Sequence, residues 1–160
     1  MGSQEHEGLS ERVSPPGAIK ETIAEFRRQE LKVAHCHGVF DLLHPGHLDH
    51  LTEAKSFADV LVVSVTADEF VNKGPGRPVY GIDRRLQMLE ALQIVDVVFE
   101  SSSPTALDAI DIVKPDFFVK GPDYIDLESD ITGNIQLERR QVEKNGGQLV
   151  FTSGPSMSSS

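Results

Sequence analysis

The chain alternates short apolar runs with stretches in which apolar residues recur every three or four positions. The runs are rich in Val, Ile, Leu and Phe, which is typical of strands. They predict strands at 31–36, 59–66, 95–99, 116–120 and 148–151. Helical spacing predicts helices at 17–30, 47–57, 82–92, 104–113 and 134–144.

This order of elements predicts an α/β fold. Strands that alternate with helices imply a parallel sheet with right-handed crossovers. The strand runs are almost continuously apolar, as expected when helices cover both faces of the sheet. The expected architecture is therefore a doubly wound, Rossmann-like parallel sheet of five strands, whose ligands bind at the carboxyl ends of the strands.

The length of the chain fits one domain with a single core, since it has 160 residues. Residues 1–16 are rich in Ser, Glu and Gly, lack apolar periodicity and predict a flexible leader. The domain is expected to occupy residues 17–160. The first residues show no basic region followed by an apolar stretch, as a secretory signal would.

Charge and composition exclude several classes of partner. The formal net charge of -10 disfavours nucleic acid, and no apolar run approaches the roughly 20 residues that cross a bilayer. The single cysteine, Cys36, permits no internal disulfide and favours a reducing compartment, which predicts a soluble cytoplasmic protein. A phosphate site in so acidic a chain would need local cations, a helix N-terminus and Mg²⁺.

Candidate chemistry lies directly after the first predicted strand, in the segment GVFDLLHPGH at 38–47. Gly38 lets backbone N–H groups approach a ligand, and the helix that follows offers unpaired N–H donors. Pro45 and Gly46 suit a tight entry to that helix. His44 and His47 are three residues apart, so both imidazoles can donate to phosphate oxygens and stabilise a leaving pyrophosphate.

The segment 38–47 resembles the signature of the cytidylyltransferase-like nucleotidyltransferase superfamily, with its HxGH motif. The segments NKGPGRPV at 72–79 and VKGPDY at 119–124, together with Arg85, resemble the adenylyltransferase domain of bacterial ADP-heptose synthase. Glycerol-3-phosphate cytidylyltransferase is the next most similar in pattern. The likeness runs along almost the whole chain from residue 31.

This resemblance implies a role for each matching residue. His44 and His47 would stabilise the transition state at the α-phosphate, and Lys73 would contact the α-phosphate and the acceptor phosphate. Arg85 would hold the acceptor or order the site, so the implied catalytic set is His44, His47, Lys73 and Arg85. The residues expected to bind the nucleotide are Gly38, Val39, Phe40, Gly46, Lys120, Gly121, Asp123, Ser158, Ser159 and Ser160.

The end of the chain, MSSS at 157–160, resembles the second signature of the family, which binds the β- and γ-phosphates at the head of the last helix. The family continues there into a Lys and a closing helix. The sequence ends at Ser160, so the closing helix is expected to be missing.

The function that the resemblance implies is transfer of a nucleoside monophosphate from a nucleoside triphosphate, with ATP favoured, to a sugar phosphate such as a heptose 1-phosphate. Pyrophosphate leaves, and Mg²⁺ is carried by the nucleotide. One alternative is a CTP-dependent cytidylyltransferase for glycerol 3-phosphate or another phosphorylated alcohol. Another is a catalytically silent nucleotide-sensing domain, against which both histidines argue.

Relatives in this family are commonly homodimers, and the apolar region 92–99 is a candidate seam between subunits. A buried strand would have the same apolar sequence. The sequence leaves both interpretations open.

Five of the six histidines fall within sixteen positions, which raises the alternative of a metal site. They are His35, His37, His44, His47 and His50. There is no Cys pair and no His-Glu-x-x-His spacing, so no metal site is predicted. His35 and His37 share one strand face and are expected to be structural, and Asp41 is expected to cap the helix that follows rather than contact Mg²⁺.

Overall fold

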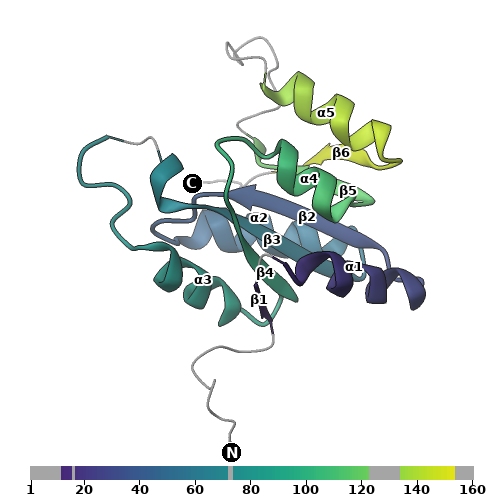
Figure 1. Ribbon diagram of the computed structural model, residues 1–160, viewed down its shortest axis with the longest axis horizontal. Coiled ribbons are helices and arrows are strands. Elements are labelled where there is room, and N and C mark those ends of the chain that lie inside the picture. The colour runs from purple at the N-terminus through teal and green to yellow at the C-terminus, as the bar shows by residue number, and fades with distance from the viewer. Residues whose placement is uncertain (1–11, 16, 72–73, 123–133, 154–160) are drawn as a thin grey trace, which may run out of the picture.

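The computed structural model describes residues 12–15, 17–71, 74–122 and 134–153. Within these ranges a parallel sheet lies between two layers of helices, which is the doubly wound α/β architecture expected from the sequence (Figure 1). The strands follow the order β1-β4-β3-β2-β5-β6, and every neighbouring pair is parallel. No helix of the described ranges is long and apolar enough to cross a bilayer.

The sheet has six strands rather than the five predicted. They are β1 (Val13–Ser14), β2 (Val33–Gly38), β3 (Val60–Thr66), β4 (Val97–Ser101), β5 (Phe117–Lys120) and β6 (Gln148–Phe151). The additional strand, β1, pairs with β4 at the sheet edge and falls within the range 1–16 expected to be a leader. Two residues beside a Pro-Pro pair are too short a run to show any periodicity.

Each of the five predicted helices is present, with ends shifted by at most a few residues. They are α1 (Ile19–Arg28), α2 (Pro45–Ser56), α3 (Ile82–Glu90), α4 (Leu107–Val113) and α5 (Asn134–Lys144). A short 3-10 helix, η2 (Asp68–Phe70), follows β3 and was not predicted. Helix α4 begins at Leu107 rather than near residue 104. The N–H of its first residue, Leu107, donates to the Thr105 hydroxyl oxygen at 3.3 Å.

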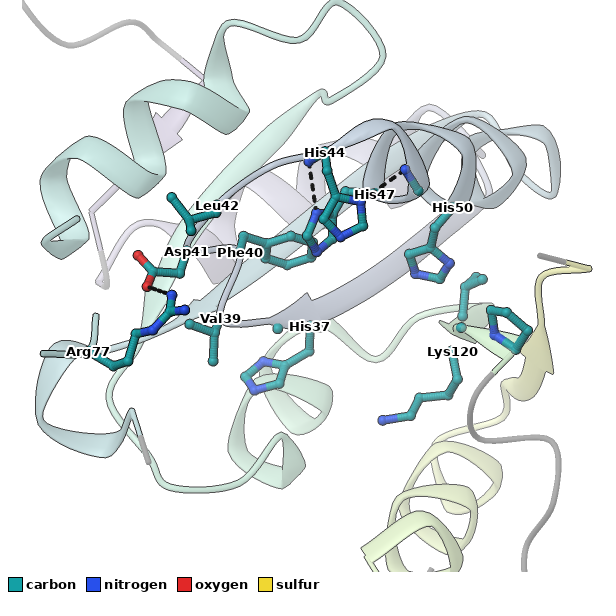
Figure 2. Close-up of a pocket in the computed structure, with 15 residues that line it drawn as sticks. His37, Val39, Phe40, Asp41, Leu42, His44, His47, His50, Arg77 and Lys120 are labelled. Carbon is teal, nitrogen blue, oxygen red and sulfur yellow. Dashed lines mark hydrogen bonds and ion pairs between the residues drawn. The ribbon is translucent and has the colours of Figure 1, made fainter. Parts of the chain in front are cut away.

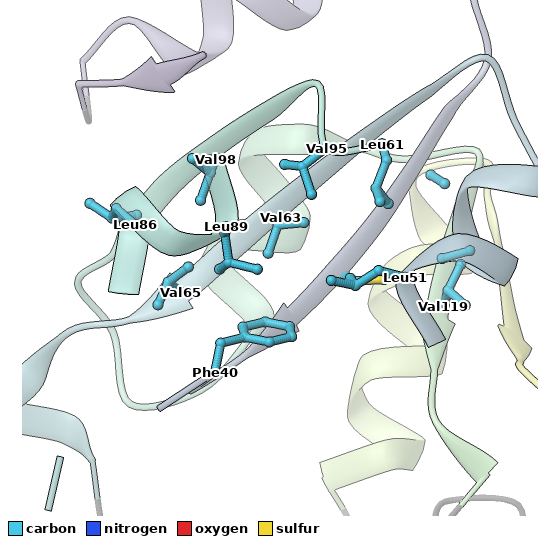
Figure 3. Close-up of a cluster of buried hydrophobic side chains, with 13 residues drawn as sticks. Phe40, Leu51, Leu61, Val63, Val65, Leu86, Leu89, Val95, Val98 and Val119 are labelled. Carbon is cyan, nitrogen blue, oxygen red and sulfur yellow. The ribbon is translucent and has the colours of Figure 1, made fainter. Parts of the chain in front are cut away.

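Helices α2 and α3 cover one face of the sheet. Leu51 of α2 and Leu89 of α3 are fully buried there against Val63 of β3 (Figure 3). Helices α1, α4 and α5 cover the other face, where two further apolar clusters form. Strand β3 is buried at every residue, as expected of a largely apolar strand covered by helices on both faces.

The second half of the apolar region 92–99, considered as a possible subunit seam, lies in the core of the domain, whereas Gln93 in its first half is exposed. Val95, Val98 and Phe99 have at most 1% of their surface exposed. The region therefore reads as a buried strand, and a homodimer remains a prediction.

Strand β2 is where the chain order reverses. It pairs with β3 on one side and with β5 on the other. Helix α2, which follows β2, and helix α5, which follows β5, lie on opposite faces of the sheet. Ligands of doubly wound sheets bind outside the carboxyl ends of the strands at such a switch point. The ends of β2 and β5, Gly38 and Lys120, mark that position.

Candidate functional site

A cavity of about 740 Å³ opens at the carboxyl ends of β2 and β5 (Figure 2), within the size range of small-molecule sites. It is lined by His37, Gly38, Val39, Phe40, Asp41, Leu42, His44, Gly46, His47, His50, Arg77, Val119, Lys120, Gly121 and Pro122. This set includes most of the residues predicted from the sequence. The predicted residues that line the cavity are Gly38, Val39, Phe40, His44, Gly46, His47, Lys120 and Gly121.

His44 and His47 lie side by side at the start of α2, with ring centroids 4.0 Å apart. His44 is the N-cap, and its Nδ1 accepts the Gly46 N–H at 3.0 Å. Nδ1 of His47 accepts the His44 N–H at 3.2 Å. Because Nδ1 is an acceptor in both rings, each neutral imidazole carries its proton on Nε2. The two rings thus offer Nε2–H donors at the positive end of the helix.

Two glycines make this arrangement possible. A Cβ at Gly46 would lie 2.9 Å from Cε1 of His44, so only glycine leaves space for that ring over the helix start. A Cβ at Gly38 would lie 3.0 Å from Cε2 of Phe40. The centroid of the Phe40 ring in turn lies 5.7 Å from the centroid of the His47 ring. The glycines of the motif therefore serve the placement of the neighbouring rings.

Asp41 does not cap α2, contrary to the sequence-based prediction. Its carboxylate accepts N–H groups from Val79 at 2.7 Å and Tyr80 at 2.9 Å and pairs with Arg77 at 2.9 Å. Burial opposes ionisation, but the hydrogen bonds from Tyr80 and Val79 and the Arg77 guanidinium hold the pKa of Asp41 below its ordinary value. The N-cap of α2 is instead His44, whose ring accepts the Gly46 N–H.

Arg85 is fully buried and is not among the residues that line the cavity. Its guanidinium donates to the carbonyl oxygens of Tyr80, Val39 and Thr66 at 2.8–2.9 Å and pairs with Asp68 at 2.5 Å. One side chain thereby joins the loops after β2 and β3 to the start of α3. Of the two roles that the resemblance implied, this geometry favours ordering the site over contact with the acceptor.

The β5 side of the cavity carries an ion pair. Nζ of Lys120 lies 2.9 Å from Oε1 of the buried Glu138 on α5 and 5.6 Å from the centroid of the Phe118 ring. The pair balances a charge that would otherwise sit alone at the edge of the sheet.

Two further histidines line the cavity, and one of them, His37, was expected to be structural. His37 projects from the end of β2, and His50 extends from α2, where Nδ1 lies 3.0 Å from Oγ1 of Thr152. Burial lowers the pKa of His50. The alternation along β2 could have shown that His37 stands at the strand end beside the motif glycine. The contact of His50 with Thr152 joins residues 102 positions apart, so no local pattern predicts it.

Several predicted site residues lie outside the described residues. They are Lys73, Asp123, Ser158, Ser159 and Ser160. Within the part of the chain that is described, no group of three or more His, Cys, Asp or Glu side chains is arranged to hold a metal ion. Cys36 is fully buried, and burial raises the pKa of its thiol to about 12.

Comparison with known proteins matches this site to one family. A family model described as Cytidylyltransferase-like matches residues 35–159. The chain is 42% identical over 115 residues to the bifunctional protein HldE of Paramagnetospirillum magneticum, covering 71% of this chain and 24% of that protein. It is 42% identical over 141 residues to the protein of that name in Bradyrhizobium diazoefficiens, covering 87% and 27%. The chain spans about a quarter of the length of these relatives.

Solved structures show a similar fold. The lipopolysaccharide core biosynthesis protein from Thermoplasma volcanium is 26% identical with a TM-score of 0.65, covering 79% of this chain and 99% of that one. Pantoate-beta-alanine ligase from Francisella tularensis has a TM-score of 0.59 at 16% identity, covering 89% and 67%. At that identity the likeness concerns the fold alone.

Proposed function

Because the chain belongs to the cytidylyltransferase-like family, we propose that it transfers a nucleoside monophosphate from a nucleoside triphosphate, with ATP favoured, to a sugar phosphate such as a heptose 1-phosphate. Pyrophosphate is the second product. The family and the HldE relatives make the chain a nucleotidyltransferase. The identity of both substrates is part of the proposal.

The observation that carries the proposal is the pair of Nε2–H donors of His44 and His47 at the start of α2. Pyrophosphate gains charge as it leaves, and preorganised donors stabilise such charge more strongly in the transition state than in the ground state. The helix N-terminus adds a positive potential at the same position. A chain of net charge -10 needs this local reversal of sign to bind a triphosphate.

The reaction requires no general base. An anionic oxygen of the acceptor phosphate attacks the α-phosphorus, and a new P–O bond forms. The bond from the α-phosphorus to the oxygen bridging to the β-phosphate breaks, and its electron pair leaves with pyrophosphate. The tasks of the protein are alignment and electrostatic stabilisation.

Mg²⁺ would be carried by the triphosphate oxygens, where it neutralises charge on the leaving group. The chemistry of the cavity supports this assignment. Asp41 is the one carboxylate among the described lining residues, and its oxygens are bonded to Arg77, Val79 and Tyr80. The triphosphate thus supplies the ligands that the described wall does not.

Support for a sugar phosphate comes from the relatives. The HldE proteins match at about 40% identity, and a lipopolysaccharide core biosynthesis protein has a similar structure. Lys73 is proposed to contact the α-phosphate and the acceptor phosphate, and Asp123 and Ser158–Ser160 the nucleotide. The second candidate is a cytidylyltransferase that uses CTP and glycerol 3-phosphate.

One assay separates these functions. Pyrophosphate release is measured with ATP or CTP and Mg²⁺ against heptose 1-phosphate, other sugar 1-phosphates, glycerol 3-phosphate and pantetheine phosphate. Fastest release with ATP and a sugar 1-phosphate is expected. Fastest release with CTP and glycerol 3-phosphate would establish the second candidate, and pantetheine phosphate would indicate an enzyme of coenzyme synthesis. No release with any pair, while nucleotide still binds, would indicate a sensing domain.

A further inference from the structure

A hydrogen-bonded chain of three side chains ends at the wall of the cavity. His35 and His37 project from the same face of β2, and Ser64 stands on β3 directly beside His37 in the strand register. Oγ of Ser64 lies 2.8 Å from Nε2 of His35 and 2.7 Å from Nδ1 of His37. His35 and Ser64 are fully buried, whereas His37 lines the cavity.

Both imidazoles are neutral at physiological pH. Burial, with a smaller effect of Lys120, lowers the pKa of His37 to about 4. Burial and the neighbouring His37 hold the pKa of His35 well below its ordinary value. Each ring therefore carries one N–H and one lone pair, and the Ser64 hydroxyl has a single hydrogen to donate. The direction of the chain decides which nitrogen of His37 carries its proton.

The surroundings favour one direction. Oγ1 of Thr66 lies 3.4 Å from the Gly38 carbonyl oxygen, which can only accept, so the Thr66 hydrogen points there. The Thr66 oxygen then presents a lone pair to Nε2 of His37, 3.5 Å away. This contact suits an Nε2–H group but is too long to satisfy it, so the N–H can still donate to a ligand. His35 donates to Ser64, and Ser64 donates to Nδ1 of His37.

The opposite direction would move the His35 proton to Nδ1. That atom is buried without a hydrogen-bond partner among the described residues, and orphaned N–H donors are rare in protein interiors. His37, whose ring lines the cavity, therefore carries its N–H on Nε2, while its Nδ1 accepts from Ser64.

The charges around the cavity indicate which part of a nucleotide meets this donor. His44 and His47 lie at the positive start of α2, which suits phosphates. His37 lies away from these rings, between Val39 and Lys120 (Figure 2). There His37 is neutral and the Lys120 charge is balanced by Glu138. A wall without net charge suits the uncharged nucleoside, at the switch point between β2 and β5 where such sheets bind nucleotides.

We propose that His37 is a specificity-determining residue whose Nε2–H donates to a ribose hydroxyl oxygen of the bound nucleoside triphosphate, with Ser64 and His35 holding the ring in the donor tautomer. The inference rests on the proposed function for the identity of the ligand. A neutral donor adds no attraction for phosphate. It instead penalises a sugar that lacks the hydroxyl, because the N–H is then left with only the 3.5 Å contact to Thr66.

Equilibrium binding tests the contact without turnover. Dissociation constants of ATP, 2′-deoxy-ATP and 3′-deoxy-ATP are measured by calorimetry with Mg²⁺, or of the CTP series if the transfer assay selects CTP. The chain as it stands is expected to bind one deoxy analogue about tenfold more weakly than the ribonucleotide. His37→Phe should weaken ribonucleotide binding by a similar factor and bring the ratio near one. His37→Gln, which keeps an N–H donor, should retain most of the ratio.

His50→Asn is the matched control, since it also removes an imidazole from the cavity wall, and it should keep the ratio of the unchanged chain. Equal affinity for all three nucleotides, or a ratio that His37→Phe leaves unchanged, would overturn the proposal. Failure of the two proposals is distinguishable. A His37-dependent ratio without pyrophosphate release overturns only the transferase function, and turnover with a ratio independent of His37 overturns only the ribose contact.

Discussion

The imidazole rings of His44 and His47 stand 4.0 Å apart, and each accepts a backbone N–H through Nδ1. Those two bonds fix both rings to the start of α2, where the helix dipole also favours a phosphate. The two residues of the capping box are thus the proposed phosphate donors. A change at either position alters helix entry and chemistry together.

His44→Ala and His47→Ala should each lower the rate of pyrophosphate release by about 10²-fold or more, as loss of an oxyanion-type donor does. Single-turnover rates at saturating substrates measure the effect. Leu48→Ala is the control, because this neighbouring side chain on α2 is 41% exposed and absent from the cavity wall. Turnover that either alanine variant left unchanged would remove that imidazole from the mechanism.

Arg85→Met should destabilise the fold by about 3 kcal/mol or more, since it leaves buried carbonyl oxygens without their donor. Arg84→Met is a matched control one residue away, where the side chain is exposed and bonded to Gln87. That change should stay within about 0.5 kcal/mol. Urea unfolding gives both free energies. Equal stability of the two variants would contradict the role of Arg85 in joining the loops.

Asp41→Asn should loosen the segment around Val79 and Tyr80, because an amide keeps one acceptor oxygen and loses the charge that pairs with Arg77. A loss of about 1–3 kcal/mol is expected. Native-state hydrogen exchange at the amides of Val79 and Tyr80 reports it directly. If Asp41 instead capped α2, faster exchange would appear at the first amides of that helix.

The stability of the chain should fall as the pH drops from about 6.5 toward 4. The pKa of His37 is about 4 in the folded chain and 6.5 ordinarily, so the unfolded chain takes up this proton first. Each such imidazole lowers the free energy of unfolding by up to about 1.4 kcal/mol for each pH unit that the pH falls in this window. The lowered pKa values of Asp41 and Asp116 act in the same direction, at more acidic pH.

His37→Asn removes one of these imidazoles. The slope of the unfolding free energy against pH, measured by urea titration between pH 4 and 6.5, should then be smaller than in the unchanged chain. Identical slopes would show that His37 is not buried as a neutral ring.

Much of the fold was predictable because the strands of a doubly wound sheet are apolar runs and its helices show a clear period. The residues of the motif likewise carried most of the site, since the segment 38–47 builds its own local geometry. The roles of Asp41 and Arg85 depend on partners 19 to 46 positions away, namely Tyr80, Val39 and Thr66. Periodicity contains no information on such contacts.

His37 illustrates the same limit at the cavity wall. Its position on a strand face was predictable from alternation. Its donor character depends on Ser64 and Thr66 of the next strand, and the pairing register that brings them together is a property of the folded sheet.

The central claim is that the two imidazoles of the HxGH segment contact the phosphates of a bound nucleoside triphosphate. A crystal structure with Mg²⁺ and an α,β-methylene nucleotide tests it most directly. The account predicts phosphate oxygens within about 3 Å of Nε2 of both His44 and His47. A nucleotide bound elsewhere, or bound in this cavity with its phosphates out of reach of both rings, would contradict it.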